Sequence, residues 1–253
     1  SGNPEDYDRL LEMGIDIRGR IALVRYSVPY SYRGFKALTA QRRGAAGILI
    51  YSDPEDDGYL KGDTFPDGPW GPSSHIQRGG ITYDFFVPGD PLTPGWPSLP
   101  GAPRIETSEA RPLPRILSAP LSWRDAQEIL RRLEGPAAPE EWQGGLPFRY
   151  RVGPGPARVR MRIRMREPVT PIWTVVARVR GAEAPEETVV LGNHRDAWIF
   201  GGCDPSSGTA TMMEVARAFG TLLREGRRPK RTIVLASWDA EEFSLTSSTE
   251  WGE

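Results

Sequence analysis

The chain has 253 residues, with 32 lysines and arginines against 33 aspartates and glutamates, for a formal net charge of −1. This balance gives no global reason to expect nucleic acid or an anionic membrane as a partner. The single cysteine, Cys203, excludes an internal disulfide framework, and no apolar run approaches the ~20 residues of a membrane span.

The first part of the chain predicts a small α/β module. Residues 21–26 and 47–51 are short apolar runs typical of buried strands, and residues 33–44 have the spacing of a helix. Strand, helix and strand in such close succession predict a parallel βαβ unit with a right-handed crossover. Residues 54–115 are rich in Gly, Pro and Asp without periodicity, which predicts an irregular insertion.

The chain then returns to regular structure. Residues 112–117 predict a strand, and Ser122 is placed to cap a helix over 123–134 that Gly135 ends. Residues 135–145 are rich in Pro and Gly and have the composition of a linker.

Residues 157–166 alternate apolar side chains with arginine, which predicts a half-buried strand with one basic face. That face could be a nucleic-acid edge or a solvated outer surface. No aromatic platform accompanies the arginines, which favours the solvated surface.

After Pro171 the pattern predicts a second α/β block. Its strands are expected over 172–179, 188–191 and 232–237, with a helix over 207–225. A further helix is expected to begin within 243–253. Overall the chain predicts an α/β fold.

Polar residues follow two strands of this second block. His194 comes after one strand, and the pair Glu241-Glu242 comes after another. Functional residues of open α/β sheets gather at the carboxyl ends of strands. A neutral imidazole is a good zinc ligand, and Asp196 could hold the other ring N–H and fix the tautomer.

The remaining carboxylates suit a two-metal site. Asp204 could bridge two cations ~3.5–4 Å apart. One residue of the pair Glu241-Glu242 could ligate a metal, and its neighbour could act as general base toward metal-bound water. Taken singly, a lone His-x-Asp is more often structural, and a Glu pair often begins a helix. Their order at strand ends favours the metal site.

Two local hypotheses concern the loop before the 207–225 helix. The Asp204-Pro205 bond is expected to be cis, because a bridging carboxylate needs an unusual turn and the cis form costs only about 0.5–1 kcal/mol at X-Pro. Cys203 could be a reactive thiol, but a small buried filler is the favoured interpretation.

The motifs together resemble the glutamate carboxypeptidase II family, which includes N-acetylated alpha-linked acidic dipeptidase-like proteins and transferrin receptor. The matching segments are 77–79, 89–95, 193–208, 238–243 and 248–251, so the resemblance covers essentially the whole chain. It implies a protease-associated (apical) domain over 1–165, followed over 166–253 by the incomplete start of a zinc peptidase α/β sheet domain.

The resemblance also implies site roles. His194 would ligate one of two zinc ions, Asp204 would bridge both, Glu242 would ligate the second, and Glu241 would be the general base and acid. Asp196 would support the imidazole.

A structural calcium ion that joins the two domains is implied as well. Its ligands would be Glu250, Glu253 and the backbone carbonyls of Thr93 and Trp96, and such oxygen donors suit Ca²⁺. Without the resemblance, the two glutamates would be interpreted as residues on an exposed helix face.

Arg33 matches an arginine that binds the substrate's terminal carboxylate, a task suited to a guanidinium fork. Without the resemblance it would be an ordinary residue at a helix start. The family's asparagine in that pocket is replaced near Gly79-Gly80, so the resemblance leaves specificity for acidic dipeptides open.

Each zinc ion needs about three protein ligands. The family supplies a further Asp and His beyond Glu253, and His75 does not match either. We therefore expect a fragment or truncated isoform that is itself inactive.

For the parent protein the resemblance implies a two-zinc exopeptidase acting on short peptides. It also implies a homodimer at the extracellular side of the cell surface, held by a membrane anchor absent from this chain. The alternative is a non-catalytic, receptor-like binding module. Retention of all four zinc-site residues favours the enzyme.

Overall fold

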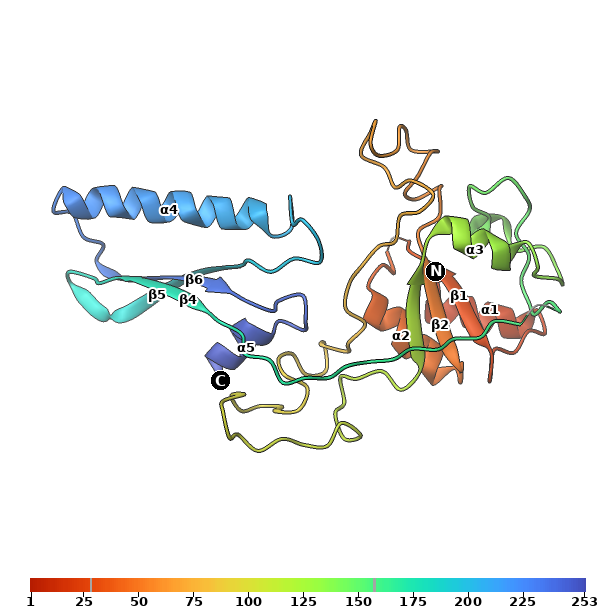
Figure 1. Cartoon of the computed structure of the whole chain (residues 1–253), viewed down its shortest axis with the longest axis horizontal. Helices are drawn as coiled ribbons and strands as arrows, with labels where there is room; N and C mark the ends of the chain where they lie inside the picture. The colour runs from red at the N-terminus through yellow and green to blue at the C-terminus, as the bar shows by residue number, and fades with distance from the viewer. Residues whose placement is uncertain (28, 157) are drawn as a thin grey trace. The chain divides into compact units, whose positions relative to one another are not determined.

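The computed structural model describes residues 1–27, 29–156 and 158–253 and divides the chain into two compact units (Figure 1). The first comprises Ser1–Tyr83 and Leu113–Arg166, and the second Asp84–Pro112 and Glu167–Glu253. The expected α/β fold is confirmed. The sequence placed residues 84–112 in the first domain, whereas the structure groups them with the second unit.

The first unit is built on a parallel sheet with the order β1-β2-β3. The strands are β1 (Ile21–Arg25), β2 (Gly47–Tyr51) and β3 (Leu117–Leu121). The helices are α1 (Pro4–Glu12), α2 (Arg33–Arg42), α3 (Trp123–Leu130) and the short 3-10 helix η1 (Glu140–Trp142). The predicted βαβ unit is confirmed as β1-α2-β2 with parallel pairing.

Two apolar clusters cover the faces of this sheet. Ile48 and Ile50 of β2 join one cluster with Ala37 and Ala40 of α2. Tyr51 joins the other, which contains Ala126 and Leu130 of α3. Every residue of β2 is buried, as a central parallel strand with a continuous apolar run requires.

Lys36 of α2 is fully buried and bonded entirely to backbone. Its Nζ donates to the carbonyl oxygens of Ser1, Arg25 and Tyr30 at 2.7, 3.0 and 2.5 Å. Burial lowers the pKa of Lys36 to about 8, because desolvation disfavours the charged form. This side chain ties α2 to three residues that precede it in the chain.

The segment 135–145 is not a linker, because it packs into the first unit. Ala138 is buried, and the Gly145 N–H donates to the carboxylate of Asp53 at 2.7 Å. Asp53 also accepts from the hydroxyls of Tyr51 and Tyr150. A buried carboxylate needs such donors, and the donors here fix the 135–150 region.

Two predicted strands differ from the structure. The strand expected over 112–117 lies at Leu117–Leu121 instead, and its N-cap neighbour Ser122 holds the start of α3 as predicted. Residues 158–166 form no strand. Ala157, the first residue of that predicted strand, lies outside the described residues. Alternation predicted an extended conformation, but pairing requires a partner, and none of the described strands lies in register with it.

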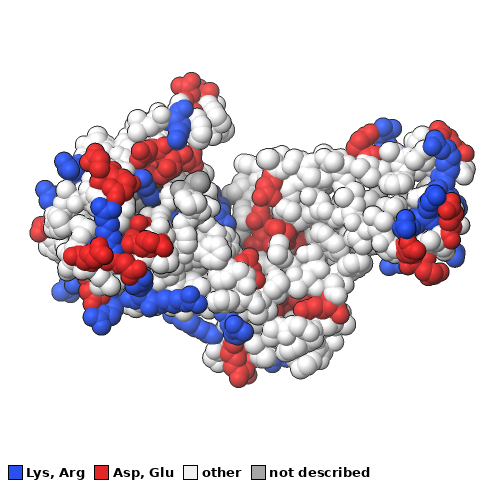
Figure 2. All heavy atoms as spheres, turned by 180° about the vertical axis from the view of Figure 1, so that it is seen from behind, with Lys and Arg blue, Asp and Glu red and all other residues white. Residues whose placement is uncertain are grey.

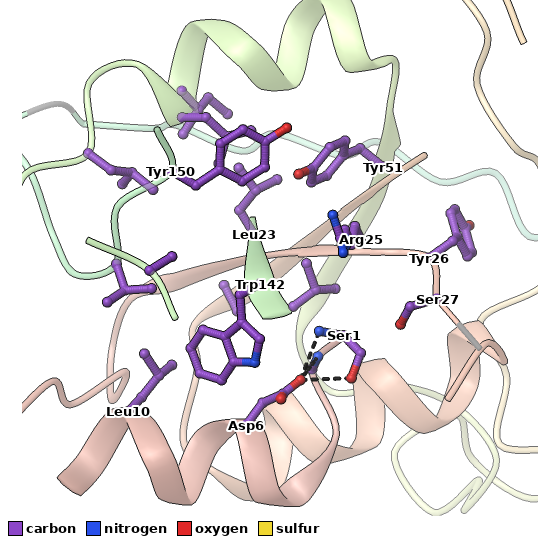
Figure 3. Close-up of a pocket in the computed structure, with 18 of the residues that line it drawn as sticks. Ser1, Asp6, Leu10, Leu23, Arg25, Tyr26, Ser27, Tyr51, Trp142 and Tyr150 are labelled. Carbon is purple, nitrogen blue, oxygen red and sulfur yellow. Dashed lines mark hydrogen bonds and ion pairs between the residues drawn. The ribbon is translucent and has the colours of Figure 1, made fainter. Parts of the chain in front are cut away.

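A cavity of about 1370 Å³ lies beside β1, and all its lining residues belong to the first unit. Figure 3 shows Leu10, Leu23 and Trp142 at one part of it and Arg25 with Ser27 at another. The cavity therefore has an apolar part and a polar part.

The second unit has a mixed sheet with the order β4-β6-β5. The strands are β4 (Val175–Val179), β5 (Ala184–His194) and β6 (Arg231–Trp238), and β6 pairs antiparallel with β4 and parallel with β5. The long helix α4 (Ser206–Arg224) lies along one face of the sheet, and α5 (Thr246–Gly252) follows β6 (Figure 1). Among the described residues, none of the helices is long and apolar enough to cross a membrane.

Candidate metal centre

Parallel pairing of β5 with β6 sets the place of the candidate site. His194 is the last residue of β5 and pairs in register with Trp238, the last residue of β6. The loops that follow both strands therefore leave the sheet at the same edge, which is where ligand sites of such sheets form.

His194 lies among carboxylates. Its Nε2 is 2.8 Å from Oδ1 of Asp204, and its Nδ1 is 3.9 Å from a carboxylate oxygen of Glu241. Burial lowers the pKa of His194, but the charges of Glu241, Asp204 and Asp196 outweigh burial and raise the pKa overall. The ring is thus held in a negative field that would equally favour a cation.

Asp196 joins the two loops. Its carboxylate accepts the backbone N–H groups of Glu241 and Glu242 at 3.0 and 3.1 Å. The Nδ1 of His194 lies 3.1 Å from the Asp196 carbonyl oxygen and 3.5 Å from its Oδ1. Sequence reasoning expected contact with the ring alone and missed the link to the glutamate pair. That pair follows Ala240, whose φ of 52° lies in the left-handed region.

Asn193 is a positioning residue that sequence reasoning did not identify. Its amide Nδ2 donates to the carbonyl oxygens of His194 and Pro205 and to the hydroxyl of Thr209, at 2.6, 3.2 and 2.9 Å. A Cβ on Gly208 would lie 2.1 Å from Oδ1 of Asn193. Gly208 therefore lets α4 approach the end of β5. Asn193 and Gly208 were the two residues in the sequence that could have indicated this contact.

The loop before α4 contains one confirmed and one wrong prediction. The Asp204-Pro205 bond is cis, as predicted. Cys203 is exposed, so its interpretation as a buried filler is wrong. The loop places Cys203 next to the exposed carboxylate of Asp204 rather than in the core.

The glutamate pair is electrostatically crowded. Burial raises the pKa of Glu241, with Glu242, Asp196 and Asp204 adding to the shift and His194 opposing it. Burial and the charge of Asp204 likewise raise the pKa of Glu242. Within the described residues, however, no three such side chains converge on one point as a metal cage. The structure brings His194 and Asp204 together and places the glutamates beside them.

The expected calcium ligands lie in the second unit. The Glu250 carboxylate accepts the N–H groups of Asp90 and Ser98 at 2.7 and 2.5 Å. Burial and the nearby charge of Glu250 raise the pKa of Glu253, while a backbone N–H of Gly95 opposes them. These contacts join α5 to residues 84–112.

The carbonyl oxygen of Thr93 accepts the N–H of Trp96 in a turn at 3.3 Å, which leaves a second lone pair on Thr93. Thr93 itself is buried. The two glutamates and the two carbonyl-bearing residues therefore share one part of the second unit.

Arg33 begins α2 in the first unit, and its guanidinium lies against a glycine pair. Its Nε donates to the Gly80 carbonyl oxygen at 3.1 Å, and a Cβ on Gly79 would lie 1.8 Å from the guanidinium carbon. Arg33 also lines the cavity beside β1. Gly79 is thus required by the present position of the arginine.

Comparison with known proteins agrees with this division. Residues 1–82 match the PA domain, and residues 174–253 match peptidase family M28. Both rat "Aminopeptidase NAALADL1" at 42% identity and the "Probable glutamate carboxypeptidase" of Arthroderma benhamiae at 44% align with 100% of this chain. The chain belongs to the glutamate carboxypeptidase II-like family.

A third relative, the "Glutamate carboxypeptidase 2 homolog" of Caenorhabditis elegans, is 39% identical over the whole chain. The chain spans 35%, 36% and 34% of the rat, Arthroderma and Caenorhabditis relatives, which is about a third of their length. The family resemblance drawn from the motifs is confirmed.

Proposed function

We propose that this chain supplies the first part of the two-zinc site of an exopeptidase that acts on short peptides. One observation carries the proposal. The imidazole of His194 and the carboxylate of Asp204 meet at the sheet edge to which β6 delivers Glu241 and Glu242. The match to peptidase family M28, which is generally zinc-dependent, and the names of the relatives support the same chemistry.

The side chains at this site are of the types that bind zinc, but they are too few to complete a two-zinc site. Imidazole nitrogen and carboxylate oxygen are ordinary zinc ligands. Burial, together with neighbouring carboxylates, raises the pKa values of both glutamates, and a bound cation would oppose both effects. His194, Asp204 and Glu242 would hold the metal. We propose that the missing ligands come from the longer polypeptide and that this segment alone is inactive.

The chain's own residues would divide the work. Bound zinc supplies an acidified water and a positive charge for the developing oxyanion. Glu241 would accept a proton from that water and return it to the leaving amine. Asp196, by holding the backbone of Glu241 and Glu242, would keep the base in place relative to His194.

Retention of His194, Asp204, Glu241 and Glu242 at one sheet edge favours the enzyme over a receptor-like binding module. A protein that only binds a partner has no need for an imidazole in contact with a carboxylate beside a pair of glutamates of raised pKa.

Zinc content per chain, measured by elemental analysis after dialysis, tests the proposal. It is compared between this chain and one extended to the length of its relatives. We expect two zinc ions per chain and peptidase activity only in the extended form.

Glu241→Gln should abolish activity while zinc is retained, and the exposed residue Glu225, changed to Gln, is the matched control. Absence of zinc from both this chain and the extended chain would contradict the peptidase proposal and favour the receptor-like module.

We also propose a structural calcium ion at Glu250, Glu253 and the carbonyl oxygens of Thr93 and Trp96. Calorimetric titration of calcium into this chain should give a saturable signal that Glu250→Gln removes. An unchanged signal in that variant would contradict the assignment.

A further inference from the structure

Residues 158–166 form an extended segment whose side chains alternate in character. The apolar positions are Val159, Met161, Ile163 and Met165. Between and beside them stand five arginines: Arg158, Arg160, Arg162, Arg164 and Arg166. Successive side chains of an extended chain point to opposite sides, so the arginines share one side of the segment.

Met161 shows which side faces the first unit. Its Sδ lies 3.0 Å from the position that a Cβ on Gly47 would take, at the amino end of β2. At Met161 the apolar side of the segment therefore faces the amino end of β2, and the arginines stand on the opposite side of the extended chain. Figure 2 shows a row of basic side chains along the lower margin of this unit, the margin along which the segment runs in Figure 1.

The segment leaves its hydrogen-bonding capacity unused. Within the described part of the chain, no backbone hydrogen bond and no ion pair involves residues 158–166, and all five arginines are exposed. Val159, Ile163 and Met165 are exposed as well. An extended chain with free N–H and C=O groups is a template for another strand.

We propose that residues 158–166 bind an extended acidic peptide by strand addition. Backbone hydrogen bonds would supply affinity, as in other cases of strand addition. Cross-strand neighbours lie about 4.5–5.5 Å apart, so each arginine would meet a side chain of the partner. Asp or Glu at every second position of the peptide would then pair with successive guanidinium groups, which bind carboxylates through two hydrogen bonds.

A second copy of this segment is a poor partner. In the register that pairs like positions arginine would face arginine, and like charges directly opposite are destabilising, whereas a one-residue slip would put the arginines opposite apolar residues and leave them without carboxylate partners. The sequence has one run of three acids at alternate positions, Asp53, Glu55 and Asp57. Asp53 is buried and bonded within its own unit. Asp53, Glu55 and Asp57 therefore do not supply the acidic strand, and the proposed partner is a separate peptide.

A polyanion such as single-stranded nucleic acid fits less well. It would use the arginines but leave the backbone groups unpaired, and the segment has no aromatic side chain on which bases could stack. Strand addition accounts for the free backbone and for the charge together.

A fluorescent nine-residue peptide of alternating Glu and Thr is the probe, titrated into this chain by anisotropy at about 0.15 M salt. The variant R160E/R162E/R164E should bind it about tenfold more weakly or worse, since each change replaces an attraction by a repulsion. The control R224E/R227E/R228E makes the same charge change on exposed arginines of the second unit and should bind as the unmodified chain does.

A second peptide, N-methylated at alternate backbone nitrogens, keeps every charge but cannot donate to a neighbouring strand. Strand addition predicts that it binds about tenfold more weakly or worse. Equal binding of this peptide, or of a sulfated oligosaccharide of equal charge, would overturn the proposal in favour of a simple polyanion surface.

Two further outcomes would also overturn it. One is equal weakening in the control variant. The other is loss of peptide binding in the chain extended to its relatives' length, which would assign the segment's partner to the same polypeptide. None of these measurements depends on zinc or peptidase activity, so the strand-addition proposal and the proposed function fail separately.

Discussion

The parallel strands β2 and β5 carry similar apolar runs but have different surroundings. All five residues of β2 are buried, whereas Val189, Val190 and Leu191 of β5 are 49%, 47% and 40% exposed. β2 lies between two strands and under apolar clusters on both faces, while β5 is an edge strand with α4 on one face. An apolar run thus predicts a strand, but not what covers it.

The sharpest test of this contrast is Ile50→Ala in β2. Ile50 is 2% exposed, and truncation of such a side chain costs about 3–4 kcal/mol through lost burial and a residual cavity. Hydrogen exchange of the first unit's amides should show this loss of protection. A change of protection as small as that expected for β5 would mean that the first unit's core is not close-packed.

Lys36→Met removes the polar centre of the same unit. The carbonyl oxygens of Ser1, Arg25 and Tyr30 would lose their donor, at a cost of at least about 3 kcal/mol, since unsatisfied buried acceptors cost roughly 1–3 kcal/mol each. Urea unfolding followed by exchange of first-unit amides measures it. The exposed Lys61, changed to Met, is the control and should be neutral.

The same lysine predicts a pH dependence. Its folded pKa of about 8 lies below the usual 10.5, so between these values the unfolded chain binds more protons than the folded one. The free energy of unfolding of the wild type should therefore rise relative to that of Lys36→Met as pH increases from about 8 to 9.5. If the difference in unfolding free energy between wild type and Lys36→Met stayed flat or fell, the three carbonyl acceptors would offset the effect of desolvation on the pKa of Lys36.

The smallest expected effect is Val190→Ala in β5. The side chain is half exposed, so truncation should cost well under about 1 kcal/mol in this chain. Exchange rates of β5 and β6 amides provide the measurement. If the cost equalled that of Ile50→Ala, the outer face of β5 would be covered in solution, and the contrast between the strands would disappear.

Much of the fold followed from local patterns. The bounds of β2 and the capping of α3 by Ser122 could be predicted because a buried run and a cap are properties of neighbouring residues. The 135–145 segment could not, because its place depends on the carboxylate of Asp53, 92 residues away from Gly145. For residues 158–166, the alternating pattern predicted the extended conformation correctly. It could not show whether another strand pairs with the segment.

The candidate site divided in the same way. Strand ends predicted that His194 and Glu241-Glu242 would share an edge, because parallel pairing brings carboxyl ends together. The link through the Asp196 carboxylate could not be foreseen, since it depends on a turn with φ of 52° at Ala240. The exposure of Cys203 likewise depends on how one loop leaves the sheet.

The arrangement of Gly79 beneath Arg33 has a consequence for protein engineering. A side chain at position 79 and the present guanidinium would occupy the same space, so a choice of residue at 79 is also a choice of rotamer for Arg33. A library randomised at this one position would therefore sample different directions of a single positive charge while the arginine itself stays unchanged.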